Sequence, residues 1–121
     1  MSALSIRAVV RLGHWKTPEP VPGATLTVRI GDDDEAPIGC HLEPIVAFVH
    51  EHRARCGAVL VHCGAGISRS GAACCAVLMH RHAIGRDAAL ARVRRARQWV
   101  RPNDHFMEVL LWWPRCGGAL A

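Results

Sequence analysis

A cysteine and an arginine six residues apart are the first candidates for chemistry in this sequence. The segment VHCGAGISRSG, residues 61–71, places Cys63 before a short glycine-bearing stretch and Arg69 near its end. A thiolate surrounded by inward-facing backbone N–H groups and a guanidinium can hold an anion while the sulfur attacks it. The spacing alone identifies nothing, because Cys75 and Arg81 have the same separation across CAVLMHR.

The surroundings of Cys63 distinguish it from Cys75. The apolar run AVLVH, residues 58–62, predicts a buried strand, and a helix is expected to begin near Arg69. Ligands of open α/β sheets bind at this end of the strands. Gly64 and Gly66 allow the intervening loop to turn its N–H groups inward, toward the positive end of the following helix.

An anion site of this kind would also activate the sulfur. Such surroundings lower the pKa of a cysteine to ~3.5–7.5, so the thiolate form is populated at neutral pH. Arg69 offers a planar fork that suits two oxygens of a phosphate, and Ser70 can hydrogen-bond the sulfur. The interval between Cys75 and Arg81 has no glycine and lies in mid-helix, so Cys75 is predicted to belong to the core.

The elements that would position these residues follow one another as β, β, α, β, α, α, α. This order predicts one α/β domain over residues 1–121, with a mostly parallel sheet flanked by helices. Pro44 is expected in the first turn of its helix, and Asn103 or Asp104 is expected to cap the last one. The expected strands are 4–12, 24–30 and 58–62. The expected helices start near residues 41–43, 69, 85 and 104, with Leu90, Val93, Trp99 and Val100 on the apolar side of the third.

The whole-chain composition limits the function classes. Fourteen arginines and one lysine against ten acidic residues give a formal net charge of +5, which favours anionic partners. The sequence contains no uncharged apolar run of about 18 residues, so no membrane span is predicted. The N-terminal residues lack the continuous apolar core of a signal peptide, so secretion is not expected. The six cysteines are therefore expected to be free thiols in a reducing, cytoplasmic or nuclear compartment. The adjacent Cys74 and Cys75 lack the spacing of zinc ligands.

The segment around Cys63 resembles the signature loop of the cysteine-dependent dual-specificity protein phosphatases, HC-x-x-G-x-x-R-S/T. The matching residues are His62, Cys63, Gly66, Arg69 and Ser70. AVLM (residues 76–79) and RPNDHF (101–106) are similar to family segments, and DDDEAPIG (32–39) is similar to the acid loop of the small atypical members. The resemblance covers residues 6–112 and implies a protein-tyrosine-phosphatase-like fold.

The resemblance also implies roles for individual residues. Cys63 would be the nucleophile that forms a cysteinyl-phosphate, and Asp32 would be the acid. Ser70 would help the thiolate form and leave, while His62 and Asn103 would support the site. No metal or cofactor is implied. The expected phosphate-binding residues are Gly64, Ala65, Gly66, Ile67, Ser68 and Arg69.

The chain also departs from the family pattern. The sequence leaves no room for the N-terminal hairpin and helix usual in the family. Either the chain is a shortened member of the family, or another molecule covers the exposed sheet edge, which self-association would achieve. His105 stands where glycine is usual, and there is no rhodanese-like docking domain.

Phosphorylated proteins carrying phosphotyrosine, phosphoserine or phosphothreonine are the expected substrates. RNA 5′ ends, tracked by arginines of residues 86–101, and phosphoinositides are the alternative substrates. The alternative outside the enzymes is a binding module that recognises phosphorylated partners but has no phosphatase activity.

Overall fold

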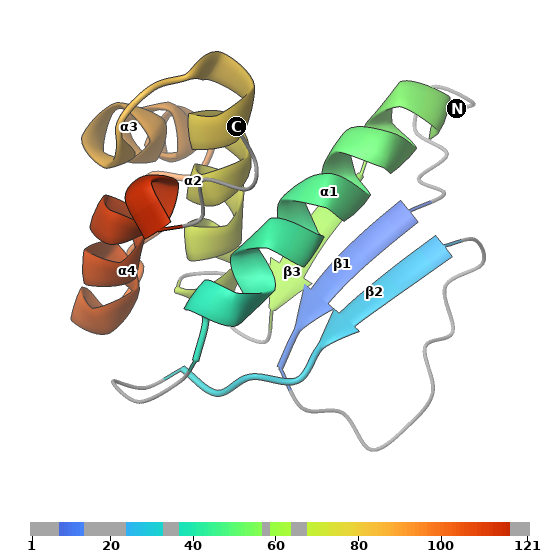
Figure 1. The fold of residues 1–121 in the computed structure, drawn as a ribbon, viewed down its shortest axis with the longest axis horizontal. Helices are drawn as coiled ribbons and strands as arrows, with labels where there is room; N and C mark the ends of the chain where they lie inside the picture. The colour runs from blue at the N-terminus through green and yellow to red at the C-terminus, as the bar shows by residue number, and fades with distance from the viewer. Residues whose placement is uncertain (1–7, 14–23, 33–36, 57–58, 64–67, 117–121) are drawn as a thin grey trace.

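The elements of the protein follow the order expected from its sequence. The computed structural model describes residues 8–13, 24–32, 37–56, 59–63 and 68–116. Figure 1 shows α1 lying over the sheet along the direction of the strands, with the other three helices grouped together to one side. The elements are β1 (Ala8–Leu12), β2 (Ala24–Val28), α1 (Gly39–Cys56), β3 (Leu60–Cys63), α2 (Arg69–His82), α3 (Arg86–Ala96) and α4 (Asp104–Cys116).

The described sheet has three parallel strands in the order β2-β1-β3. Leu12 at the end of β1 lies level with Val28 of β2 and Cys63 of β3. All five residues of β1 are buried, as expected for the central strand of a parallel sheet. Because the strands are parallel, their carboxyl ends meet at one edge of the sheet, on either side of the end of β1.

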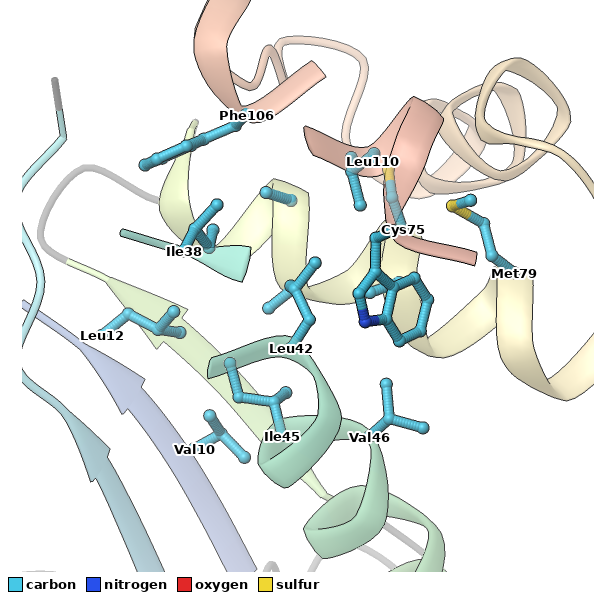
Figure 2. Close-up of a cluster of buried hydrophobic side chains, with 14 of the residues drawn as sticks. Val10, Leu12, Ile38, Leu42, Ile45, Val46, Cys75, Met79, Phe106 and Leu110 are labelled. Atoms are coloured by element: carbon cyan, nitrogen blue, oxygen red, sulfur yellow. The ribbon is translucent and has the colours of Figure 1, made fainter. Parts of the chain in front are cut away.

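The core lies between this sheet and the helices (Figure 2). Val10 and Leu12 point from β1 toward Leu42 and Ile45 of α1, and all four side chains are fully buried. The helix α1 buries Leu42, Ile45, Val46 and Val49, which recur at helical spacing. This apolar face fixes α1 against β1 and β2, while α2 packs against β3.

Cys75 belongs to this core, as predicted. Its side chain is fully buried on α2, and burial raises the pKa of its thiol to about 12. A protonated, enclosed thiol is a poor nucleophile. The Cys75–Arg81 pair is therefore not a second candidate site.

The expected position of Pro44 is wrong. The helix α1 begins at Gly39, so Pro44 is its sixth residue and stands beyond the first turn. A proline there removes the hydrogen bond to the Cys40 carbonyl. The helix starts earlier than expected because Ile38 and Leu42, four residues apart, are both fully buried.

The predicted length of α3 is also wrong at its C-terminal end. The helix ends at Ala96, and Arg97 adopts a non-helical backbone with φ −140° and ψ 89°. Trp99 was expected on the apolar face, yet it lies outside the helix and is 56% exposed. The Arg97 guanidinium lies 5.8 Å from the Trp99 ring centroid, a cation–π distance that keeps this indole at the surface.

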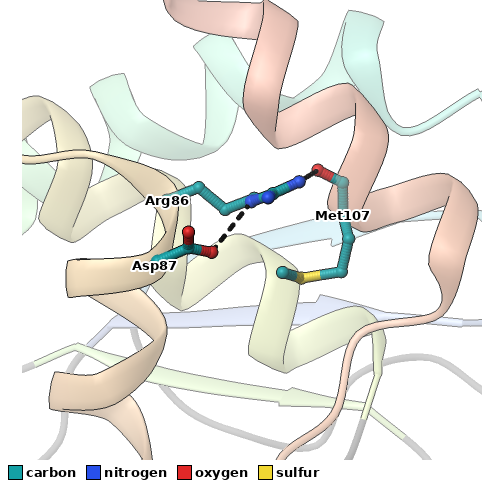
Figure 3. Close-up of polar contacts among 3 residues, drawn as sticks. All are labelled: Arg86, Asp87 and Met107. Atoms are coloured by element: carbon teal, nitrogen blue, oxygen red, sulfur yellow. Dashed lines mark hydrogen bonds and ion pairs between the residues drawn. The ribbon is translucent and has the colours of Figure 1, made fainter.

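Arginine side chains attach α3 to its neighbours. Arg86 donates to the Met107 carbonyl of α4 at 3.0 Å and to Asp87 Oδ1 at 3.2 Å (Figure 3). Arg94 donates to the Val100 carbonyl at 2.9 Å. Two of the arginines considered for RNA contacts therefore stabilise the fold by binding backbone oxygens. None of the described helices is long and apolar enough to cross a membrane.

Candidate active site

Cys63 ends β3 and lies against the first turn of α2. The Ser70 backbone N–H donates to Cys63 Sγ at 3.4 Å, and the Cys63 thiol donates to Ser70 Oγ at 3.3 Å. Both side chains are buried. The sulfur is thus held at the positive end of a 14-residue helix, where negative charge is stabilised. The predicted phosphate-binding residues Gly64, Ala65, Gly66 and Ile67 lie outside the described residues.

Arg69 is fixed from one side only. One terminal nitrogen, Nη1, donates to the Ile30 carbonyl at 3.1 Å, two residues beyond the end of β2. Its Nε is buried and has no hydrogen-bond partner in the part of the chain that the structure describes. A buried N–H without an acceptor is energetically unfavourable. An anion in front of the guanidinium would supply the missing acceptor.

Asn103 connects three parts of the site. Its Nδ2 donates to Asp32 Oδ1 at 2.8 Å, and its backbone N–H donates to Ser68 Oγ at 2.9 Å. Its Oδ1 accepts the Phe106 N–H at 2.8 Å, which makes Asn103, rather than Asp104, the N-cap of α4. The acid loop, the start of α2 and the start of α4 are therefore joined through one side chain.

Asp32 lies at the edge of the sheet where Cys63 lies. Its side chain is exposed, two residues after Ile30, whose carbonyl binds Arg69. The neighbouring Asp33 and Asp34 lie outside the described residues. Asn103 thus holds the Asp32 carboxyl two residues beyond the backbone oxygen that binds Arg69.

A close contact between α2 and the segment before α4 accounts for Gly71. A Cβ on Gly71 would lie 2.6 Å from Val100 Cγ1 and 3.8 Å from Pro102 Cγ. Real Cβ atoms do not tolerate the first of these distances. The absence of a side chain at Gly71 lets residues 100–102 approach α2 at this point, next to the hydrogen bond between Asn103 and Ser68.

His62 lies on the opposite face of β3 from Cys63, because successive strand residues alternate. The strand register sets His62 beside Arg11 of β1, whose side chain is 6% exposed. His62 is half-buried. His62 therefore neighbours Cys63 in sequence, while its side chain lies on the other face of the sheet. Its role in tuning the Cys63 thiolate stays a prediction.

Two contributions to the site were missed from the sequence. The Ile30 carbonyl gives no signal, because any residue can supply a backbone oxygen. Gly71 gives a weak signal, since it directly follows Arg69 and Ser70. Among the described residues, no group of three His, Cys, Asp or Glu side chains is arranged to hold a metal ion.

Comparisons with known proteins agree with this arrangement. The family model of the dual specificity phosphatase catalytic domain matches residues 1–116. Dual specificity protein phosphatase Mpk3 of Drosophila melanogaster is 38% identical over 86 residues, covering 71% of this chain and 21% of the relative. Dual specificity protein phosphatase 14 of Homo sapiens is 37% identical over 84 residues, covering 69% of this chain and 42% of the relative.

A solved structure shares the fold over nearly the whole chain. The crystal structure of human DUSP28 matches with a TM-score of 0.86 at 30% identity, covering 99% of this chain and 85% of that one. The chain spans less than half the length of the two curated relatives. The α/β fold and the family resemblance expected from the sequence are confirmed. The described fold and the match over residues 1–116 show that the chain belongs to the dual-specificity phosphatase catalytic-domain family.

Proposed function

We propose that this chain hydrolyses phosphate monoesters on proteins through a cysteinyl-phosphate intermediate. One observation carries the proposal. Cys63 Sγ accepts the Ser70 N–H at the start of α2, while the buried Nε of neighbouring Arg69 lacks an acceptor among the described residues. This arrangement offers a nucleophile and a bidentate phosphate ligand at one point of the fold.

In the first step the Cys63 thiolate attacks phosphorus. The S–P bond forms as the P–O bond to the protein substrate breaks, and Asp32 gives its proton to the departing oxygen. Arg69 binds two of the phosphoryl oxygens and stabilises the charge that builds on them. Asn103 orients the Asp32 carboxyl through the 2.8 Å hydrogen bond.

In the second step water attacks the phosphocysteine. The ionised Asp32 takes a proton from the water as the new P–O bond forms and the S–P bond breaks. The thiolate leaves while Ser70 Oγ, 3.3 Å from the sulfur, turns its hydroxyl hydrogen toward it. Inorganic phosphate then departs, and the enzyme returns to its starting protonation state.

Both phosphotyrosine and phosphoserine or phosphothreonine fit this chemistry. The phenolate oxygen of tyrosine leaves more readily than the alkoxide of serine or threonine. The positioned acid therefore matters most for serine and threonine substrates. Asp32 supplies the group that such substrates require.

Turnover of an aryl phosphate by the wild type, Cys63→Ser and Cys75→Ser tests the proposal. We expect turnover by the wild type and by Cys75→Ser, but none by Cys63→Ser, whose hydroxyl is not ionised at neutral pH. Acid quenching during turnover should trap phosphate on Cys63, as detected by mass spectrometry. Binding of phosphopeptide without turnover by the wild type would instead identify a phospho-binding module. Full activity in Cys63→Ser would exclude the covalent mechanism.

A further inference from the structure

A groove between α1 and α4 lies beside the candidate active site and has no role in the proposed chemistry. Its volume is about 910 Å³. The wall from α1 includes Glu43 and Ala47, and the wall from α4 includes Glu108 and Trp112. Residues three or four apart share one face of a helix, so each wall is a continuous stripe.

The groove is acidic and aromatic, unlike the chain as a whole. Glu43 and Glu108 face it, and neither lysine nor arginine is among its described lining residues. This stands against a formal net charge of +5 for the chain. Trp112 is 49% exposed along the same groove. A cation placed between two carboxylates and an indole is stabilised both by charge and by the ring.

One end of the groove reaches the elements that carry the catalytic acid. Gly39 and His105 line it, and these residues belong to the first turns of α1 and α4. The N-cap of α4 is Asn103, which binds Asp32. A polypeptide whose phosphate lies at Arg69 can therefore continue past Asp32 into the space between the two helices.

We propose that this groove binds a basic segment of the phosphoprotein substrate, adjacent in sequence to its phosphorylated residue. A lysine or arginine of that segment lies against Trp112 between Glu43 and Glu108. The proposal rests on the phosphatase function proposed above and adds a substrate class, namely phosphoproteins with basic residues next to the phosphorylation site.

The test compares two phosphopeptides that differ only in a pair of arginines replaced by glutamines. We expect the wild type to show a KM roughly tenfold lower for the arginine peptide at low salt, with similar kcat. The difference should shrink as salt rises, because the groove is open to solvent. Moving the arginine pair along the peptide identifies the spacing that the groove requires.

Three variants separate the groove from general charge effects. The double variant Glu43→Gln, Glu108→Gln should abolish the KM difference, and Ala47→Arg should do the same by placing a cation inside the groove. Glu51→Gln removes an exposed carboxylate of α1 that does not line the groove, so it should behave as wild type. Turnover of a small aryl phosphate should be unchanged in all three.

Binding of the unphosphorylated arginine peptide, followed by fluorescence anisotropy, tests the groove without catalysis. We expect the wild type to bind it and the double variant to bind it roughly fivefold or more weakly. If the aryl phosphate is not turned over, the proposed function fails while this measurement still decides the groove.

Equal KM values for the two peptides, or a KM difference that survives in the double variant, would overturn the groove proposal. It would also fail if the double variant changed only the sedimentation of the protein, since the groove would then be a contact between two copies of the chain.

Discussion

Asn103 and Asp32 are 71 residues apart in sequence, and their side chains form a 2.8 Å hydrogen bond. The amide that binds the carboxylate belongs to the same residue whose Oδ1 caps α4. The position of Asp32, the proposed acid, is therefore coupled to the packing of the last helix. The same Asn103 binds Ser68 through its backbone N–H, so the exposed Asp32 side chain is also connected to the start of α2.

Replacing Asp32 by asparagine should lower kcat strongly for phosphoserine and phosphothreonine substrates, by ~10²–10⁴-fold. The loss should be small for aryl phosphates with acidic phenols, because these leaving groups need little protonation. The variant should also lose the alkaline limb of the kcat–pH profile. Steady-state kinetics over a series of leaving groups measures the effect.

Asp33→Asn and Asp34→Asn are the matched controls, and each should be mild. A large, leaving-group-dependent loss in either of them, with Asp32→Asn unaffected, would move the acid by one or two residues.

Two substitutions of Asn103 should separate its two roles. Asn103→Ala removes the cap and should destabilise the protein by about 1 kcal/mol. Asn103→Asp keeps a good capping residue but replaces the amide donor with a carboxylate that repels Asp32. We expect urea denaturation to show little change for Asn103→Asp while kcat for phosphoserine peptides falls, by up to about 10²-fold.

If Asn103→Asp instead lost stability and activity in parallel, the hydrogen bond to Asp32 would have no role beyond the fold.

Arg69→Lys should damage kcat/KM nearly as much as Arg69→Ala, by about 10²-fold or more. Lysine keeps the charge but cannot bind two phosphate oxygens in a plane while also donating to the Ile30 carbonyl. Kinetics with an aryl phosphate measures the loss. Recovery of most activity by lysine would mean that Arg69 acts as a point charge.

Gly71→Ala should destabilise the protein by roughly 1–3 kcal/mol, because the added methyl group meets Val100 Cγ1 at 2.6 Å. The same strain should move residues 100–103 and lower activity. Val100→Ala makes room for the added methyl group. The double variant Gly71→Ala, Val100→Ala should therefore lose less stability than the sum of the losses in the two single variants. Urea denaturation of the three variants checks this, and additive losses would contradict the contact.

The stability of the protein should fall as pH rises above about 9. Burial raises the pKa of Cys74 to about 11 and that of Cys75 to about 12, from 9.0 in each case. At a pH between the unfolded value of 9.0 and these raised values, the unfolded chain loses thiol protons that the folded chain retains, so the free energy of unfolding falls. Below pH 9.0 both thiols are protonated in the folded and the unfolded chain, so the stability that they contribute is fully present.

The chain suits this measurement because it has no tyrosine and one lysine. Apart from the four other thiols, few groups titrate in the same range. Urea denaturation across this pH range should give a shallower decline for Cys75→Ala than for the wild type. Identical slopes would show that the Cys75 thiol does not remain protonated in the folded protein.

The sequence alone was sufficient to locate the strand that ends at Cys63 and the helix that begins at Arg69, and to assign Cys75 to the core. These conclusions depend on local patterns: an apolar run, two glycines and a helix start all lie within a few residues. The order of the elements and the parallel sheet follow from similar short-range periodicity. Parallel pairing then places the ends of β2 and β3 at one edge, so Asp32 and Cys63 were expected near each other.

Only the tertiary structure decided the contacts that complete the site. Asn103 reaches Asp32, and Arg69 reaches Ile30, because α2 packs against β3 and α4 packs against α2. Hydrophobic patterns give the buried face of a helix but not its offset along a neighbouring element. Tertiary contacts also outweigh local propensity at two positions that the sequence predicted wrongly. Burial of Ile38 moves the start of α1 ahead of Pro44, and the cation–π contact with Arg97 keeps Trp99 at the surface.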